Sequence, residues 1–121
     1  MKRVLVVDDS GLTRSQVQSM LEECWDAEVL TAEDGQQALE LLSSAEDVDL
    51  IVTDIEMPVM GGVELVQQLR ARDETMYLPI LVMSTLGQAK ERDKALNSGA
   101  DAFIQKPVTR EALEQILRDL D

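Results

Sequence analysis

The chain has 121 residues with a formal net charge of −13, no histidine and a single cysteine, Cys24. This length fits one domain with its own core. The acidic charge argues against a nucleic-acid-binding face. The lack of histidine excludes histidine acid–base catalysis and the common zinc sites. A single cysteine excludes an internal disulfide, so we expect a cytoplasmic protein. No apolar run approaches the ~20 residues of a membrane span, so we expect no membrane partner.

Short apolar segments alternate along the chain with segments of helical periodicity. Strands are expected, in chain order, at residues 4–7, 29–31, 50–53, 80–83 and 102–104. These segments are almost continuously apolar, which is typical of strands buried on both faces of a parallel sheet.

Helical signals fill each interval between the strands. The first helix is indicated by apolar residues at helical spacing, namely Val17, Met20, Leu21 and Cys24. Residues 34–37 resemble a capping box that opens a second helix, whose apolar face is Ala38, Leu39, Leu42 and Ala45. Leu65, Val66 and Leu69 mark a third helix. Gly99 is expected to end a fourth helix and Thr109 to cap a fifth.

The fourth helix differs from the others in its small apolar face. Residues 88–98 offer only Ala89, Ala95 and Leu96 as apolar contacts, beside the cations Lys90, Arg92 and Lys94. We expect this helix to be weakly anchored, which favours movement or an interface. The alternative is an ordinary solvated helix.

The alternation predicts an α/β fold, a (βα)5 unit that forms a single domain over residues 1–121. Right-handed crossovers make this a doubly wound parallel sheet, and five strands fit the flavodoxin-like strand order 2-1-3-4-5. That order places a ligand crevice between the first and third strands.

Five polar residues are expected at the edge of this sheet where all the strands end. The first strand leads into Asp8 and Asp9, the third into Asp54, the fourth into Ser84 and the fifth into Lys106. Taken singly, each has an ordinary interpretation as a cap, turn or surface residue. Their convergence at one edge indicates a site.

Three neighbouring carboxylates repel one another. At ~5 Å and an effective dielectric near 20, each pair costs roughly 3 kcal/mol. A divalent cation offsets this repulsion, and hard oxygen ligands suit Mg²⁺. With Lys106 opposite, the set is suited to phosphoryl transfer, with Asp54 as the nucleophile that forms an acyl phosphate.

Glu33 and Asp34 follow the marginal second strand and are expected to be loop and cap residues.

Over essentially its whole length the chain resembles the receiver domain of two-component response regulators, of the chemotaxis-regulator-like kind. The matching residues are Asp8-Asp9, Asp54 with Met57-Pro58 and Gly62, Ser84, and Gly99-Ala100-Asp101 leading to Lys106-Pro107. The resemblance implies a phosphoacceptor module of a phosphorelay rather than an enzyme, although it would assist its own phosphotransfer and autodephosphorylation. Its partners would be a histidine kinase or a histidine phosphotransfer protein, and its downstream target or fused output domain is left open.

The resemblance also assigns a role to each residue of the site. Asp54 would be phosphorylated, and Mg²⁺ (or Mn²⁺) would be bound by Asp9, Asp54 and the backbone carbonyl of Glu56 directly and by Asp8 through water. Lys106 would pair with the phosphate, Ser84 and Phe103 would act as the switch, and the Lys106–Pro107 peptide would be cis. Phosphorylation would shift the loop after the fourth strand and the face of the fourth helix, fifth strand and fifth helix.

Three further positions bear on the lifetime of the phosphate and on the switch. Glu56 and Leu86 lie where receivers vary, and our hypothesis is that they tune access of the attacking water. Thr85 is larger than the residue usual at its position, which would restrict the loop shift.

Other functions stay open at this point. The chain could be a receiver-like interaction module that does not use phosphorylation, although the intact acids, Ser84 and Lys106 argue against this. A haloacid-dehalogenase-type phosphatase needs an acid two residues after its nucleophile, and position 10 is Ser. A flavodoxin-like FMN carrier needs a phosphate-binding loop where the acid pair lies. The chain could be a complete single-domain protein or a receiver cut from a longer regulator.

Overall fold

The computed structural model describes residues 2–44 and 47–120. Within that part of the chain, five parallel strands form one sheet in the order β2-β1-β3-β4-β5. The strands are β1 Arg3–Val7, β2 Glu28–Ala32, β3 Leu50–Asp54, β4 Ile80–Ser84 and β5 Ala102–Gln105. The helices are α1 Gly11–Trp25, α2 Gly35–Ser44, α3 Gly62–Arg70, α4 Ala89–Asn97 and α5 Arg110–Leu120, with a 3-10 turn, η1, at Leu86–Gln88. The expected doubly wound fold and its strand order are confirmed.

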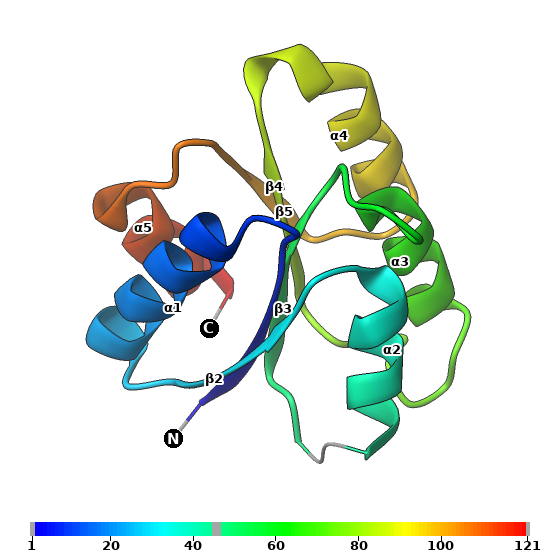
Figure 1. Ribbon diagram of the computed structural model, residues 1–121, viewed down its shortest axis with the longest axis horizontal. Coiled ribbons are helices and arrows are strands. Elements are labelled where there is room, and N and C mark those ends of the chain that lie inside the picture. Colours follow the sequence, from blue (N-terminus) through cyan, green and yellow to red (C-terminus); the bar gives the residue numbers. More distant parts are fainter. Residues whose placement is uncertain (1, 45–46, 121) are drawn as a thin grey trace.

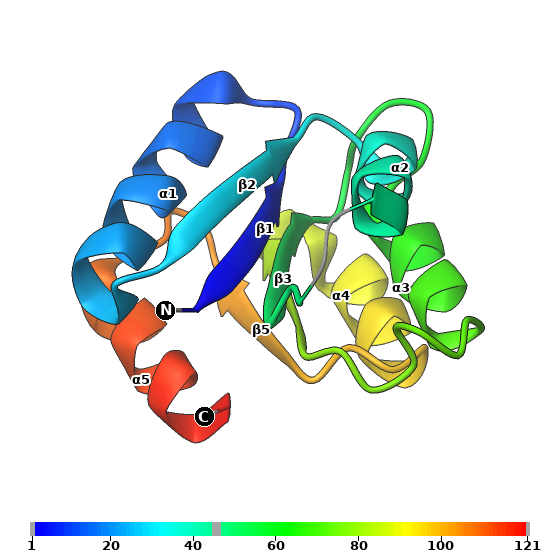
Figure 2. The same ribbon diagram turned by 90° about the horizontal axis from the view of Figure 1, so that it is seen from below.

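Helices cover both faces of the sheet. Figures 1 and 2 show α1 and α5 on one side and α2, α3 and α4 on the other. Alternate residues of the same strand enter different cores: Val4 and Val6 pack toward α1 and α5, whereas Leu5 and Val7 pack toward α2 and α3. The central strands are therefore buried on both faces, which is why their sequences are almost continuously apolar.

The strands extend beyond the predicted segments, because ladder hydrogen bonds need no apolar side chain. Asp54 and Ser84 are consequently the last residues of β3 and β4 rather than the first residues of the loops that follow. Asp54 pairs with Met83 and Ser84 pairs with Gln105. This register brings the carboxyl ends of the central strands to one edge of the sheet.

The helix ends carry most of the predicted caps. Asp34 Oδ1 accepts a 2.9 Å hydrogen bond from the Gln37 amide, as the predicted capping box requires. The Gln37 side chain, however, accepts from the Glu33 amide rather than from that of Asp34, so the return bond of the box is displaced by one residue. Thr109 Oγ1 accepts from the Ala112 amide at 3.2 Å. Gly99 follows α4 with a φ of 120°. Ala45, expected on the apolar face of α2, lies outside the described residues.

Helix α4 buries only one of its side chains, that of Ala95, as its composition predicts. The turn η1 before it was not predicted. There, Thr85 and Gln88 form a capping box, with the Thr85 amide donating to Gln88 Oε1 at 2.9 Å. Across residues 2–44 and 47–120, no helix is both long enough and apolar enough to span a membrane.

Candidate functional site

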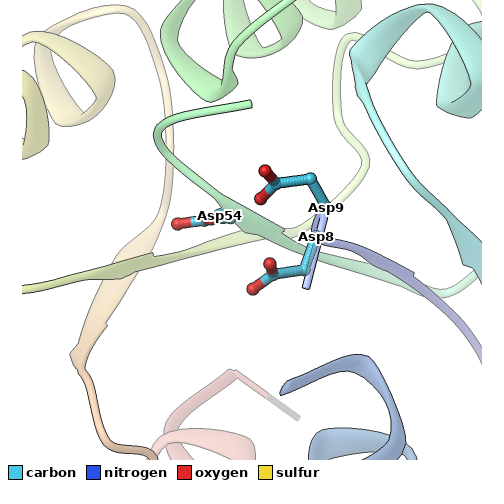
Figure 3. Close-up of side chains that lie close together, drawn as sticks. All are labelled: Asp8, Asp9 and Asp54. Carbon is cyan, nitrogen blue, oxygen red and sulfur yellow. The ribbon is translucent and has the colours of Figure 1, made fainter. Parts of the chain in front are cut away.

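Three carboxylates gather at the carboxyl ends of β1 and β3. Asp8, Asp9 and Asp54 each contribute an oxygen atom, and these atoms lie within 4.8 Å of one another. Figure 3 shows the three side chains arranged around one space. Asp8 and Asp54 are buried and Asp9 is exposed. The predicted convergence of these acids is present, and such a group of hard oxygen atoms could hold a divalent cation.

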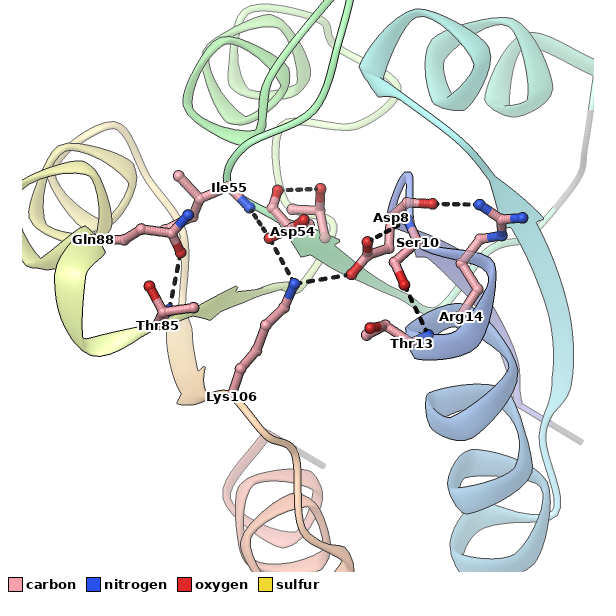
Figure 4. A network of polar contacts seen from close by, with 10 residues as sticks. Asp8, Ser10, Thr13, Arg14, Asp54, Ile55, Thr85, Gln88 and Lys106 are labelled. Carbon is pink, nitrogen blue, oxygen red and sulfur yellow. Dashed lines mark hydrogen bonds and ion pairs between the residues drawn. The ribbon is translucent and has the colours of Figure 1, made fainter.

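Lys106 reaches the same place from the loop after β5. Its Nζ lies 2.9 Å from Asp54 Oδ1 and 3.1 Å from Asp8 Oδ2 (Figure 4). The Lys106 amide donates to the Ser84 carbonyl at 2.8 Å, and the Lys106–Pro107 peptide is cis. One ammonium therefore neutralises part of the charge of two buried carboxylates.

The environment changes the ionisation of this pair. Burial raises the pKa of Asp54, and the nearby Asp8 charge adds to this effect, while hydrogen bonds from Lys106 and from the Ile55 amide oppose it. Burial alone would lower the pKa of Lys106, but its hydrogen bonds to Asp54 and Asp8 and their charges leave that pKa above its ordinary value. Lys106 thus remains an ammonium at neutral pH.

The loop between β1 and α1 holds Asp8 from several sides. Asp8 Oδ1 accepts from the Ser10 amide at 2.8 Å, and the Ser10 hydroxyl caps α1 by accepting from the Thr13 amide at 3.3 Å. Arg14 Nη1 donates to the Asp8 carbonyl at 2.6 Å (Figure 4). Sequence reasoning missed Arg14, because an arginine near the start of a helix has no pattern that indicates a bond back to the preceding loop.

Gly62 determines the path of the chain after Asp54. A Cβ at this position would overlap the Asp54 carbonyl oxygen and lie 3.0 Å from the Ile55 Cα. The Gly62 amide donates to the Ile55 carbonyl at 2.8 Å. The backbone of the β3–α3 loop therefore folds closely against the end of β3, which only a residue without a side chain allows.

Comparison with known proteins identifies the family to which this fold belongs. The family model of the response regulator receiver domain matches residues 4–118. The chain belongs to this family.

Relatives of this receiver agree with the assignment. It is 38% identical to a chemotaxis protein CheY homolog of Campylobacter jejuni, over 98% of this chain and 91% of that protein. The structure of the chemotaxis response regulator CheY4 of Vibrio cholerae matches with a TM-score of 0.89 at 34% identity, covering 100% of this chain and 99% of that chain. The receiver domain of a Pseudomonas aeruginosa sensor histidine kinase, solved with magnesium in its active-site cleft, has the same fold, with a TM-score of 0.88 at 24% identity over 98% of this chain and 96% of that chain.

The remaining predicted site residues lie on β4 and β5 and in the segments that follow β3 and β4. Ser84 is buried at the end of β4, whereas Glu56 is exposed and Leu86 is 79% exposed. Phe103 is 40% exposed on β5, so it is not a plain core residue, and the Arg92 guanidinium lies over its ring. Glu33 is an exposed loop residue and Asp34 caps α2, so neither joins the site.

A second cluster missed by sequence reasoning braces the opposite end of the sheet. The Arg70 guanidinium donates to the carbonyls of Gly99, Thr75 and Leu78 and pairs with Asp101 at 2.9 Å. Asp101 also accepts from the Ile80 amide at 2.8 Å. The presence of Asp101 in the receiver motif was the only sequence signal for this cluster. The cluster ties α3 to the segment between α4 and β5.

Proposed function

We propose that this receiver is a phosphoacceptor switch in which Asp54 takes a phosphoryl group from a phosphohistidine on a histidine kinase or histidine phosphotransfer protein. The observation that carries the proposal is the contact of one ammonium, Lys106 Nζ, with both Asp54 and Asp8 inside a group of three carboxylates. Receivers are signalling modules rather than classical enzymes, and this arrangement positions a nucleophile and balances charge, which is what phosphoryl transfer needs.

The acid cluster fits a hard divalent cation, and Mg²⁺ is the cation we propose. Asp9, Asp54 and the Glu56 backbone carbonyl would hold it directly, and Asp8 through water. The buried acids, only partly neutralised by Lys106, supply the charge that such an ion requires. When bound, the ion would neutralise charge on the phosphate oxygens.

The transfer step uses the ionised form of Asp54. One carboxylate oxygen forms a bond to phosphorus while the bond between phosphorus and the imidazole nitrogen breaks, and the electron pair of that bond stays on the nitrogen. Lys106 then lies where it can pair with the phosphate, and Ser84 can donate its hydroxyl to a phosphate oxygen. The resulting acyl phosphate is the signal.

The proposed response involves Ser84, Phe103 and the face made by α4, β5 and α5. Weak anchoring of α4, which buries only Ala95, supports movement there. The capping box between Thr85 and Gln88 is the local structure that must adjust when Ser84 turns toward the phosphate. A bound phosphate would shift an existing equilibrium toward the active arrangement.

We propose that Glu56 and Leu86 set the lifetime of the phosphate. Both side chains are exposed at the rim, on the loops after β3 and β4, where they can affect the approach of water. Replacing each by Ala and timing the loss of phosphate from Asp54 tests this role. Unchanged lifetimes in both variants would contradict it.

We propose the whole chain, residues 1–121, as one receiver unit, and a cytoplasmic location in view of its single cysteine. A family relative shows how such a unit can occur within a longer protein. The sensor histidine kinase TmoS of Ectopseudomonas mendocina is 36% identical over 98% of this chain, which covers 12% of that protein. Output through a fused domain or through a separate target fits this receiver equally well.

Intact mass measurement after incubation with a small acyl or amido phosphate donor tests the function. We expect one added phosphoryl group that requires Mg²⁺, is lost in Asp54→Asn and is retained in Asp73→Asn, which removes an exposed carboxylate far from the cluster in sequence. Absence of the adduct, where a control receiver is labelled, would favour an interaction module that does not use phosphorylation.

A further inference from the structure

Arg14 lies outside the set of side chains assigned above to phosphate chemistry. It belongs to the first turns of α1, and its Nη1 reaches back to the Asp8 carbonyl at 2.6 Å (Figure 4). Asp8 is completely buried and Arg14 is partly buried. A short hydrogen bond from a charged donor in such a place is among the stronger ones that a protein makes.

This contact fixes the peptide unit that leads into Asp9. The Asp8 amide is already held by the Ala32 carbonyl of β2 at 3.1 Å, and the Asp8 carboxylate by the Ser10 amide and Lys106. Arg14 holds the remaining group, the carbonyl. The peptide plane from which the Asp9 side chain departs is therefore set by Arg14.

The position of the Asp9 carboxylate depends on the backbone more than the positions of the Asp8 and Asp54 carboxylates do. Lys106 contacts Asp8 and Asp54, whereas the exposed Asp9 carboxylate makes no hydrogen bond or ion pair within residues 2–44 and 47–120. Its neighbours in the cluster carry the same charge and repel it. A fixed peptide plane is what keeps the Asp9 oxygen within 4.8 Å of the others.

We propose that Arg14 is a positioning residue of the cation site, which holds the Asp8–Asp9 peptide so that Asp9 faces Asp54. The inference rests on the proposed function, because it assigns Arg14 a role in Mg²⁺ binding. Charge alone predicts the opposite effect: a guanidinium near the site repels a cation, so its removal would tighten Mg²⁺ binding. The sign of the effect therefore separates positioning from simple electrostatics.

The test is calorimetric titration of Mg²⁺ into the wild-type protein, Arg14→Met, Arg14→Lys and Arg72→Met. Arg72 is exposed, and its side chain forms no hydrogen bond or ion pair in the described part of the chain, so Arg72→Met removes the same charge without the contact. We expect Arg14→Met to bind Mg²⁺ about tenfold more weakly than Arg72→Met, as outer-shell substitutions at metal sites do. Arg14→Lys keeps a charged donor on a shorter side chain, so its affinity for Mg²⁺ should lie between those of Arg14→Met and the wild type.

A second readout is the backbone amide resonance of Asp9 in the metal-free protein. We expect it to shift or broaden in Arg14→Met and to stay in place in Arg72→Met. Equal or tighter Mg²⁺ binding in Arg14→Met than in Arg72→Met would overturn the inference. If Arg14→Met does not fold, Arg14→Lys decides: weaker binding than in the wild type supports positioning, and equal binding overturns it. A wild-type protein that binds no Mg²⁺ would instead contradict the metal step of the proposed function.

Discussion

The guanidinium carbon of Arg92, on helix α4, lies 4.6 Å from the centroid of the Phe103 ring on strand β5. This is the geometry of a cation–π contact, worth about 0.5–1 kcal/mol at an exposed site. It joins the weakly anchored α4 to the side chain proposed as the switch aromatic. The outward arrangement of Phe103 is therefore stabilised by a residue of the helix that we expect to move.

Removal of the Arg92 side chain should free the Phe103 ring. We expect Arg92→Met to change the population of ring positions by about twofold to fivefold, which corresponds to the loss of about 0.5–1 kcal/mol. Phe103 is the sole phenylalanine of the chain, so fluorophenylalanine labelling gives one ¹⁹F resonance that reports only on this ring. That resonance should shift or broaden in the variant.

Lys94→Met provides the matched control for this experiment. It removes one exposed cation from the same helix without touching the contact with Phe103. Its ¹⁹F spectrum should match that of the wild type. If Arg92→Met also leaves the resonance unchanged, the cation–π contact does not influence the ring.

Asp54 is expected to make the metal-free protein less stable at neutral pH. Its pKa is raised in the folded state, mainly by burial and further by Asp8, so the folded state holds the proton more tightly than the unfolded chain. Stability therefore falls as pH rises from the ordinary carboxyl pKa through the raised one. Asp54→Asn should raise Tm at neutral pH by about 4 °C, on the order of 1 kcal/mol.

Thermal unfolding of the wild type and Asp54→Asn without Mg²⁺, between about pH 4 and pH 8, measures this effect. The difference in Tm should be largest at neutral pH and should shrink toward acid pH, where Asp54 is protonated. Asp73→Asn, at an exposed position, should show no comparable gain. A difference that does not depend on pH would contradict the ionisation argument.

Gly62→Ala should damage both folding and the site. The added Cβ would overlap the Asp54 carbonyl oxygen, and neither this backbone nor Ile55 can move without displacing the end of β3. We expect a loss of about 1–3 kcal/mol in the free energy of unfolding, as for other overpacked positions. Gly87→Ala is the control, because its nearest neighbour, Thr85 Oγ1, would lie 3.9 Å away. Denaturant titration that gave the two variants equal stability would show that the loop can adjust.

Arg70→Met should destabilise the domain, although Arg70 lies at the opposite end of the sheet from the acid cluster. Arg70 donates to three backbone carbonyls and pairs with Asp101, and its side chain is only 18% exposed. Breaking this partly buried network costs about 1–3 kcal/mol, because three backbone carbonyls lose a charged donor. Arg72→Met removes the same charge from an exposed position and should change stability by about 0.5 kcal/mol or less. Comparable denaturant midpoints for the two variants would rule out the bracing role of Arg70.

Much of this receiver follows from local sequence signals. Almost continuous apolar segments predict buried parallel strands, and helical spacing with caps such as Asp34 and Thr109 predicts the helices between them. Parallel strands end at one edge, so the positions of Asp8, Asp54 and Lys106 in the chain also predict that they converge. These conclusions depend on periodicity and chain order, which can be read directly from the sequence.

The tertiary structure decided the contacts between segments that are distant or differently oriented. The bonds of Arg14 to Asp8 and of Arg70 to Gly99, the stacking of Arg92 on Phe103 and the close approach of Gly62 to Asp54 have no local pattern. Each depends on the direction in which a long side chain turns, or on the distance between two backbones, after the helices have packed on the sheet. The sequence determined which groups meet at the site, and packing determined the groups that hold them in place.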